Sequence, residues 1–262
     1  MTTQTWWGEH HFALEQTRRW HLAGLDLQLK RSAQEWHIES YRHPQQNEDE
    51  HSWSIEDSRD NLPVSSVLRR YIFNQTHENI LILPALADRS VVIKPIDPLF
   101  IPANQSVTLF VSTPLWLKIA ISKHEKPLLD IPVIRPTDTW FGSSPIRGEI
   151  CYATKVFGRI DLDQLPIRAF RAVTPVQIDN HSSQTTPIER INIPTPLLPL
   201  YSATDGRLWT PTLAVELTNN GRIPKLRIEP HLHQHAGVAT LQNAARVENQ
   251  DHFNGLFEHF FD

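Results

Sequence analysis

The sequence has few of the residues that build disulfides, flexible turns or long helices. Its 262 residues include a single cysteine, Cys151, one methionine and nine glycines. A lone cysteine forms no intrachain disulfide, which is compatible with a reducing compartment. The chain has twenty prolines, and these disfavour long helices because proline lacks a backbone donor and clashes with the preceding turn. We therefore expect a strand-rich protein located in the cytoplasm.

Long apolar runs and clusters of basic residues are missing as well. The least polar stretch, residues 99–122, is interrupted by Pro102, Pro114 and Lys118, and a bilayer span needs about 20 largely apolar residues, so we expect no transmembrane segment. The formal net charge is −4 and the basic residues are dispersed, which argues against nucleic acid as a partner. The N-terminal residues do not have the pattern of a secretory signal, so cytoplasmic location, with peripheral attachment to an inner membrane as an option, is expected.

The common catalytic motifs are also absent. The chain has no G-x-S-x-G elbow, no phosphate-binding glycine loop, no H-E-x-x-H helix and no C-x-x-C pair. Cys151 lies in the apolar segment EICYA, which is typical of a buried and unreactive thiol. We expect no cofactor and a non-enzymatic protein, while an enzyme with dispersed active-site residues stays open.

Alternating apolar residues are the main positive signal. Between residues 20 and 41 every second position is apolar over several stretches, which is typical of half-buried hairpin strands. Further short β-rich runs recur about every 8 to 12 residues and are separated by Pro, Asn or Asp, a spacing found in sandwiches and barrels. We predict an all-β fold, with an antiparallel β-sandwich architecture in one or two domains.

Composition shifts suggest three segments. We predict an N-terminal β domain over residues 1–136, with a mobile acidic loop at 43–60, and a C-terminal β domain over 137–230. Residues 231–262 are expected to form a His-rich linker and a short C-terminal amphipathic helix. A single continuous double-layered fold is the alternative.

Several sequence blocks resemble those of one prokaryotic protein family. They are TDTWFGSSPIRGEICYATK (137–155), RAVTPVQIDN (171–180), RINIPTPLLPLYSATDGRLWT (190–210) and the opening WWGEHHFALEQTRRWHLAGLDLQLKR with EWHI. The chain resembles the DUF432 family over most of its length, except for the acidic loop and residues 220–250. The family is uncharacterised, so the resemblance implies no catalytic residues. It implies an accessory role beside small-conductance mechanosensitive channels.

The same blocks contain the strongest candidate interaction surface, in which charged and aromatic residues alternate. The residues are Trp140, Arg147, Glu149, Tyr152 and Lys155, joined by Asp205, Arg207 and Trp209. Aromatic rings and guanidinium groups are enriched at protein interfaces, which favours a recognition surface. Alternatively, Trp140 and Trp209 are core anchors, and Arg147 pairs with Glu149.

Two further motifs lie near the C-terminus. His231, His233 and His235 would share one face of a strand and suit Zn²⁺ or Cu²⁺, or they belong to a polar loop without fixed geometry. Leu256, Phe257, Phe260 and Phe261 have the spacing of one helical face. That stripe either folds back onto its own domain or docks on a partner.

We hypothesise a non-enzymatic protein-interaction or accessory module whose partner is another protein, with a membrane channel as one option. The alternative is a β-scaffold that binds a small molecule or carbohydrate in a Trp-lined cleft, and the third option is an enzyme. The oligomeric state stays open.

Overall fold

Strands make up nearly all of the regular structure. A computed structural model describes residues 5–44, 51–58, 60–122, 126–142, 146, 148–156, 158–218 and 225–247. Within these ranges the helical segments are three short 3₁₀ turns, so the predicted all-β class is confirmed. The predicted C-terminal helix lies outside the described residues. The chain divides into two units, unit 1 (Met1–Ala85 and Leu115–Arg135) and unit 2 (Leu86–Pro114 and Pro136–Asp262).

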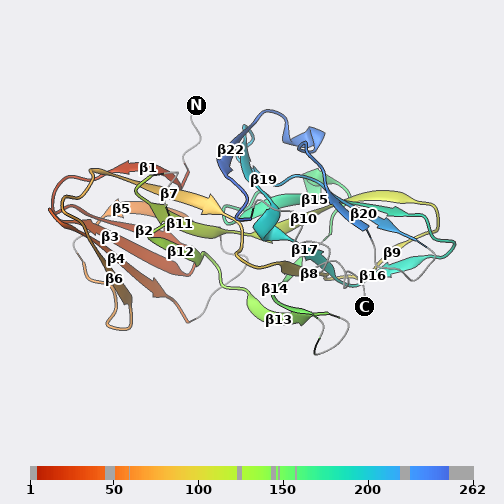
Figure 1. The fold of residues 1–262 in the computed structure, drawn as a ribbon, viewed down its shortest axis with the longest axis horizontal. Helices are drawn as coiled ribbons and strands as arrows, with labels where there is room; N and C mark the ends of the chain where they lie inside the picture. Colours follow the sequence, from red (N-terminus) through yellow and green to blue (C-terminus); the bar gives the residue numbers. More distant parts are fainter. Residues whose placement is uncertain are drawn as a thin grey trace. The chain divides into compact units, whose positions relative to one another are not determined.

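Unit 1 contains two antiparallel sheets (Figure 1). The five-stranded sheet has the order β5-β2-β3-β4-β6, formed by Trp53–Asp57, Thr17–Leu22, Leu25–Arg31, Glu35–Arg42 and Val67–Ile72. The four-stranded sheet has the order β1-β7-β11-β12, formed by Gly8–His11, Asn79–Ala85, Trp116–Ala120 and Leu129–Pro132.

The predicted alternation explains how the five-stranded sheet is buried. The apolar residues of β2, β3 and β4 that alternate along the chain are fully or almost fully buried: Trp20, Leu22, Leu25, Leu27, Leu29, Trp36 and Ile38. Phe12, which follows β1, stacks on Trp20 with ring centroids 6.3 Å apart and meets the edge of Trp36 at 5.0 Å. These aromatic contacts connect the two sheets of unit 1.

A buried arginine ties the end of β3 to the segment that follows β1. Arg31 is 8% exposed and donates hydrogen bonds to the carbonyl oxygens of Phe12 (2.8 Å) and Thr76 (3.1 Å) and to the Thr76 hydroxyl (3.1 Å). A buried guanidinium is tolerated because such oxygens replace its hydration.

Unit 2 contains three sheets. The seven-stranded sheet has the order β21-β20-β15-β19-β18-β22, and the seventh strand, β10, also pairs with β15. In that order, with β10 last, the strands are Lys225–Ile228, Leu213–Leu217, Arg171–Asn180, Leu208–Trp209, Leu200–Ala203, Ala239–Asn243 and Ser106–Pro114. The four-stranded sheet β13-β14-β8-β17 comprises Thr137–Phe141, Glu149–Val156, Val91–Pro95 and Ile191–Ile193. A third sheet pairs β9 (Leu99–Ile101) with β16 (Thr186–Ile188).

Unit 2 differs from the prediction in having parallel pairs. Strands β14 and β8 run parallel, as do β15 with β19 and β15 with β20. Period-two alternation is the same in parallel and antiparallel strands, so the sequence pattern does not distinguish them. Residues 208–217 form two strands, β19 and β20, and the break between them includes Pro211 and lies beside Pro175 of β15. Neither proline has a backbone N–H to donate to the ladder.

The units also divide the chain in a way that the predicted domain limits did not anticipate. The chain passes from unit 1 to unit 2 between Arg135 and Pro136, next to the predicted limit, but it also crosses at 85–86 and at 114–115. Residues 86–114 therefore supply β8, β9 and β10 to unit 2. The predicted acidic loop contains β5, which pairs with β2, and the predicted linker contains β22, which pairs with β18.

The lowered pKa of His10, a partly buried residue of β1, should make the stability of unit 1 depend on pH. Burial, followed by the charge of Arg18, lowers the pKa of His10 to about 4, and its ring meets the edge of Trp20 at 5.0 Å. Between pH 6.5 and about 4 the unfolded chain binds a proton that the folded chain excludes, so the free energy of unfolding falls on acidification. We expect a loss on the order of 2 kcal/mol across this window.

Urea titrations at several pH values measure this effect. His10→Phe keeps an aromatic ring beside Trp20 and should flatten the dependence. His11→Gln, at the exposed neighbouring position, should leave it unchanged. Equal slopes for the wild type and His10→Phe between pH 6.5 and 4 would show that His10 does not carry the effect.

Candidate functional site

The β13–β14 hairpin presents apolar side chains to solvent. Trp140 lies directly opposite Ile150, and residues opposite each other in a sheet project from the same face. Trp140 is 42% exposed and Ile150 is 57% exposed, whereas Phe141 and Cys151 are buried. Trp140 is therefore not the core anchor that the alternative interpretation required.

Gly148 allows the Trp140 ring to lie across the start of β14. A Cβ atom at position 148 would stand 2.5 Å from the Phe141 carbonyl oxygen, 2.8 Å from the Gly142 Cα and 2.9 Å from Trp140 Cε2. These distances are shorter than any normal contact, so a side chain at position 148 would force the strand or the indole to move. Glycine thus sets how Trp140 is presented.

Charged groups surround Tyr152, which is only 8% exposed and lies on the same face of the hairpin as Trp140 and Ile150. The Tyr152 hydroxyl donates to Asp88 Oδ1 (3.1 Å), and the Arg89 guanidinium lies 5.2 Å from the centre of the Tyr152 ring and 3.5 Å from Asp138 Oδ1. Burial, with the neighbouring Asp88 carboxylate, raises the pKa of Tyr152, so this hydroxyl stays protonated at neutral pH. We call Asp138, Trp140, Ile150 and Tyr152 the hairpin surface.

Glu149 and Cys151 belong to the inward face of the same hairpin. The Asn192 amide donates to Glu149 Oε1 at 3.2 Å. Burial, followed by the charge of Glu149, raises the pKa of the Cys151 thiol far above its usual value. A thiol of this kind is a poor nucleophile, in agreement with its expected structural role.

The remaining residues of the predicted surface do not join it. Asp205 and Arg207 form an ion pair (2.7 Å) in the turn between β18 and β19, and Trp209 is fully buried against Phe110 in the seven-stranded sheet. Lys155 is exposed opposite Lys94 on β8. Arg147 lies outside the described residues.

The histidine run packs on an aromatic ring. Phe110 contacts the His233 ring edge-on at 5.1 Å and the His235 ring in a stacked arrangement at 5.9 Å, and His233 Nδ1 accepts a hydrogen bond from the His235 backbone. Across the described ranges, no group of three or more His, Cys, Asp or Glu side chains has an arrangement that would hold a metal ion. The stripe of Leu256, Phe257, Phe260 and Phe261 falls outside those ranges.

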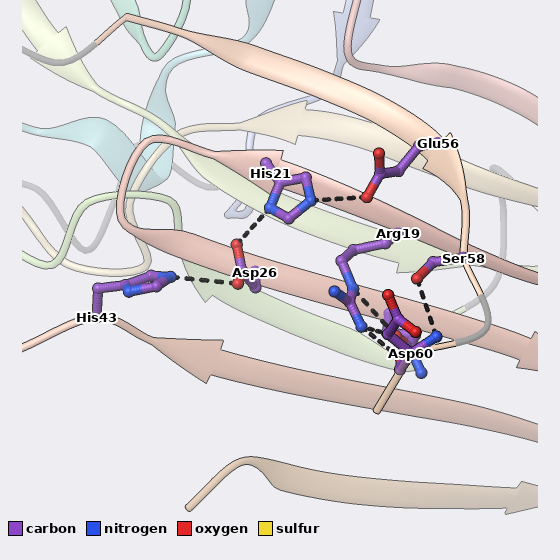
Figure 2. A network of polar contacts seen from close by, with 8 residues as sticks. Arg19, His21, Asp26, His43, Glu56, Ser58 and Asp60 are labelled. Atoms are coloured by element: carbon purple, nitrogen blue, oxygen red, sulfur yellow. Dashed lines mark hydrogen bonds and ion pairs between the residues drawn. The ribbon is translucent and has the colours of Figure 1, made fainter. Parts of the chain in front are cut away.

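Unit 1 contains a polar cavity that the sequence interpretation missed. It measures about 700 Å³ and is lined by His21, Ala23, Gly24, Asp26, His43, Pro44, Ser52, Trp53 and Ser54. One lining residue is Asp26, whose side chain is 12% exposed and whose two oxygens face His21 Nδ1 (2.8 Å) and His43 Nε2 (3.2 Å). Figure 2 shows the two imidazoles on either side of this carboxylate.

Strand register brings these side chains together. His21 on β2 lies opposite both Ser54 on β5 and Asp26 on β3, and Asp26 lies opposite Tyr41 on β4. The four side chains therefore form one row on the face of the sheet that points away from the Trp20 core. The second ring nitrogen of His21 faces Glu56 Oε1 at 3.2 Å, and both contacts are hydrogen bonds only when both nitrogens carry protons.

The backbone holds the cavity wall in place. Two backbone hydrogen bonds fix the β2–β3 turn: Ala23 N–H donates to the Ser52 carbonyl (3.1 Å) and His43 N–H donates to the Gly24 carbonyl (2.9 Å). Next to His43, the Arg42 guanidinium donates to the Val133 (2.7 Å) and Pro132 (2.5 Å) carbonyls. Burial, followed by the charge of Arg135, lowers the pKa of Arg42 to about 10, so it remains a cation at neutral pH.

The turn at Ala23-Gly24 is a sequence signal that could have predicted the pairing of His21 with Asp26. A two-residue turn at Ala23-Gly24 makes residues equally distant from it opposite each other, so Leu22 pairs with Leu25 and His21 with Asp26. His43 and Trp53 follow only from the tertiary pairing of β4 and β5.

Comparison with family models shows which protein family the chain belongs to. The model described as a protein of unknown function (DUF432) matches residues 6–259. The chain belongs to the DUF432 family. The DUF432 match includes the acidic loop and residues 220–250, which the resemblance had left out. No curated protein and no solved structure matches the chain. In the described part of this DUF432 protein, no helix is long and apolar enough to cross a membrane.

Gly148→Ala tests the constraint on the hairpin surface. We expect a loss of about 1–3 kcal/mol in the free energy of unfolding and a red shift of tryptophan fluorescence, because the new methyl group displaces the indole. Gly158→Ala is the control, since its Cβ would meet the flexible ends of the Leu99 and Leu109 side chains, at 3.2 and 4.0 Å. A Gly148→Ala protein with wild-type melting and fluorescence would contradict this account.

Ala23→Gly tests strain in the cavity wall. Ala23 has a φ of +50°, which glycine adopts without steric cost. We expect Ala23→Gly to raise stability by up to about 1 kcal/mol in urea titrations. Ala33→Gly, at an exposed position with a negative φ, should lower stability by about 0.5 kcal/mol instead. Destabilisation by both changes would rule out strain at Ala23.

Proposed function

We propose that this DUF432 protein is a non-enzymatic interaction module that docks on another protein through the hairpin surface. The observation that carries the proposal is the outward-facing pair of Trp140 and Ile150 on adjacent strands. A large aromatic side chain beside a β-branched one supplies contact area at low entropic cost, and tryptophan is enriched among the residues that dominate binding energy.

The surroundings of the pair support this function. The Trp140 ring packs over Gly148 before any partner arrives, and such preorganisation reduces the ordering cost of binding. Arg89, Asp88 and Asp138 form a polar rim, the usual boundary of an interface centre.

The architecture and location belong to the same proposal. We propose that the two sheets of unit 1 form a sandwich, with support from the contacts of Phe12 with Trp20 and Trp36. We further propose that the protein works in the cytoplasm, at the inner face of the membrane. The small-conductance mechanosensitive channel implied by the family resemblance is the first partner to test.

Site-specific cross-linking tests the docking surface. A photo-reactive residue at Ile150 should cross-link to one partner in cells, whereas the same residue at Ile160, 70% exposed and also in unit 2, should not. With the purified pair, Trp140→Ala should weaken binding at least about tenfold, as for a central interface residue. Ile160→Ala is the matched control and should leave the affinity unchanged.

Two results would refute the proposal. One is equal cross-linking from positions 150 and 160. The other is a Trp140→Ala protein that melts like the wild type and binds the cross-linked partner with unchanged affinity.

A further inference from the structure

We propose that the cavity of unit 1 is a binding site for a neutral polyhydroxylated ligand, a mono- or disaccharide, with Asp26, His43 and Ser54 as its main contacts. This inference goes beyond docking through the hairpin surface, because it concerns the other unit and a different class of ligand. It is argued from the charge, hydrogen-bonding capacity and lining of the cavity.

The charge of the described part of the lining disfavours strongly charged ligands. Among the described residues that line the cavity there is no lysine or arginine, so a phosphate or carboxylate ligand finds no fixed cation. The carboxylate in the lining, Asp26, already accepts from His21 and His43, so an organic cation competes with both imidazoles. A neutral ligand meets neither penalty.

The hydrogen-bonding capacity suits hydroxyl groups. Each oxygen of a carboxylate has two lone pairs, and in the described part of the chain each Asp26 oxygen uses one for an imidazole. When His43 Nε2 donates to Asp26, Nδ1 is an acceptor, and the Ser54 hydroxyl both donates and accepts. Hydroxyls that donate and accept at once match this set better than ligands limited to one role.

The acceptors are held in place before a ligand binds. His43 packs edge-on against Tyr41, with ring centroids 4.9 Å apart, and its backbone N–H is bound to the Gly24 carbonyl. Asp26 is fixed between the two imidazoles. Fixed polar groups bind a ligand without the cost of ordering them first.

The rest of the lining suits the C–H faces of a sugar. Ala23 and Pro44 contribute apolar surface next to the polar row. A small-molecule site usually combines such apolar walls with a few convergent polar groups, and its volume falls between about 300 and 1,000 Å³. The cavity, at about 700 Å³, has room for one or two sugar rings.

Titration calorimetry and NMR on the full-length chain test the proposal. The probes are D-glucose and maltose as neutral polyols, putrescine as an organic cation and inorganic phosphate as an anion. We expect the sugars to bind with dissociation constants in roughly the millimolar range, typical of ligands of this size, and to shift the ring C–H signals of His21 and His43. Putrescine and phosphate should produce neither heat nor shifts.

Matched variants localise the binding. Asp26→Asn should weaken sugar binding at least about tenfold, because the amide replaces an acceptor with a donor. Asp57→Asn, the same substitution on β5 outside the cavity lining, should leave it unchanged. If Asp26→Asn lowers the melting temperature, Ser54→Ala and His43→Gln give the same readout through side chains of the lining.

Several outcomes would overturn the proposal. They are absence of binding by both sugars, tighter binding of putrescine or phosphate than of sugar, and equal sugar affinity in the wild type and in well-folded lining variants. None of these outcomes bears on docking, since the hairpin surface is in unit 2 and its cross-links are measured separately.

Discussion

Burial of one face of β2, β3 and β4 is the constraint on which the rest of unit 1 depends. Trp20, Leu27 and Ile38 face inward, and a strand alternates at every residue, so their neighbours must face outward. His21 and Asp26 are therefore placed by the hydrophobic core. A slip of one residue in register would turn Trp20 to solvent, so the energy that protects the core also holds the polar row together.

Local patterns in the sequence were enough to predict the strands and much of the core. The alternation from Trp20 to Ile38 predicted buried positions correctly, and the apolar context of Cys151 predicted a buried thiol. Long-range pairing was not predictable in this way. The parallel pairing of β14 with β8 joins residues about 60 positions apart, and nothing in either strand's pattern specifies that partner. The assignment of residues 86–114 to unit 2 depends on the same kind of pairing.

In the candidate sites, too, the sequence predicted what depends on local pattern and missed what depends on long-range pairing. The aromatic block around Trp140 was visible in the sequence, but the same reasoning grouped it with Trp209, which lies in a core cluster on another sheet. A tryptophan looks the same in sequence whether it is buried or exposed, and only the neighbouring strands decide between these states. In unit 1, His21 and Asp26 were within reach of a turn-based argument, whereas His43 was not, because it reaches Asp26 through the end of β4.

The connection between β7 and β11 has a consequence for the order of folding. Ala85 and Trp116 lie opposite each other in register, so residues 86–114 leave unit 1 and return to it at neighbouring positions. The strands of the five-stranded sheet lie between residues 17 and 72 and can pair as soon as that stretch leaves the ribosome. Strand β7 can pair with β1 at that stage, but its pairing with β11 requires synthesis of the whole intervening segment. We expect the nascent four-stranded sheet to expose the other edge of β7 during this delay, when association with a chaperone would protect it.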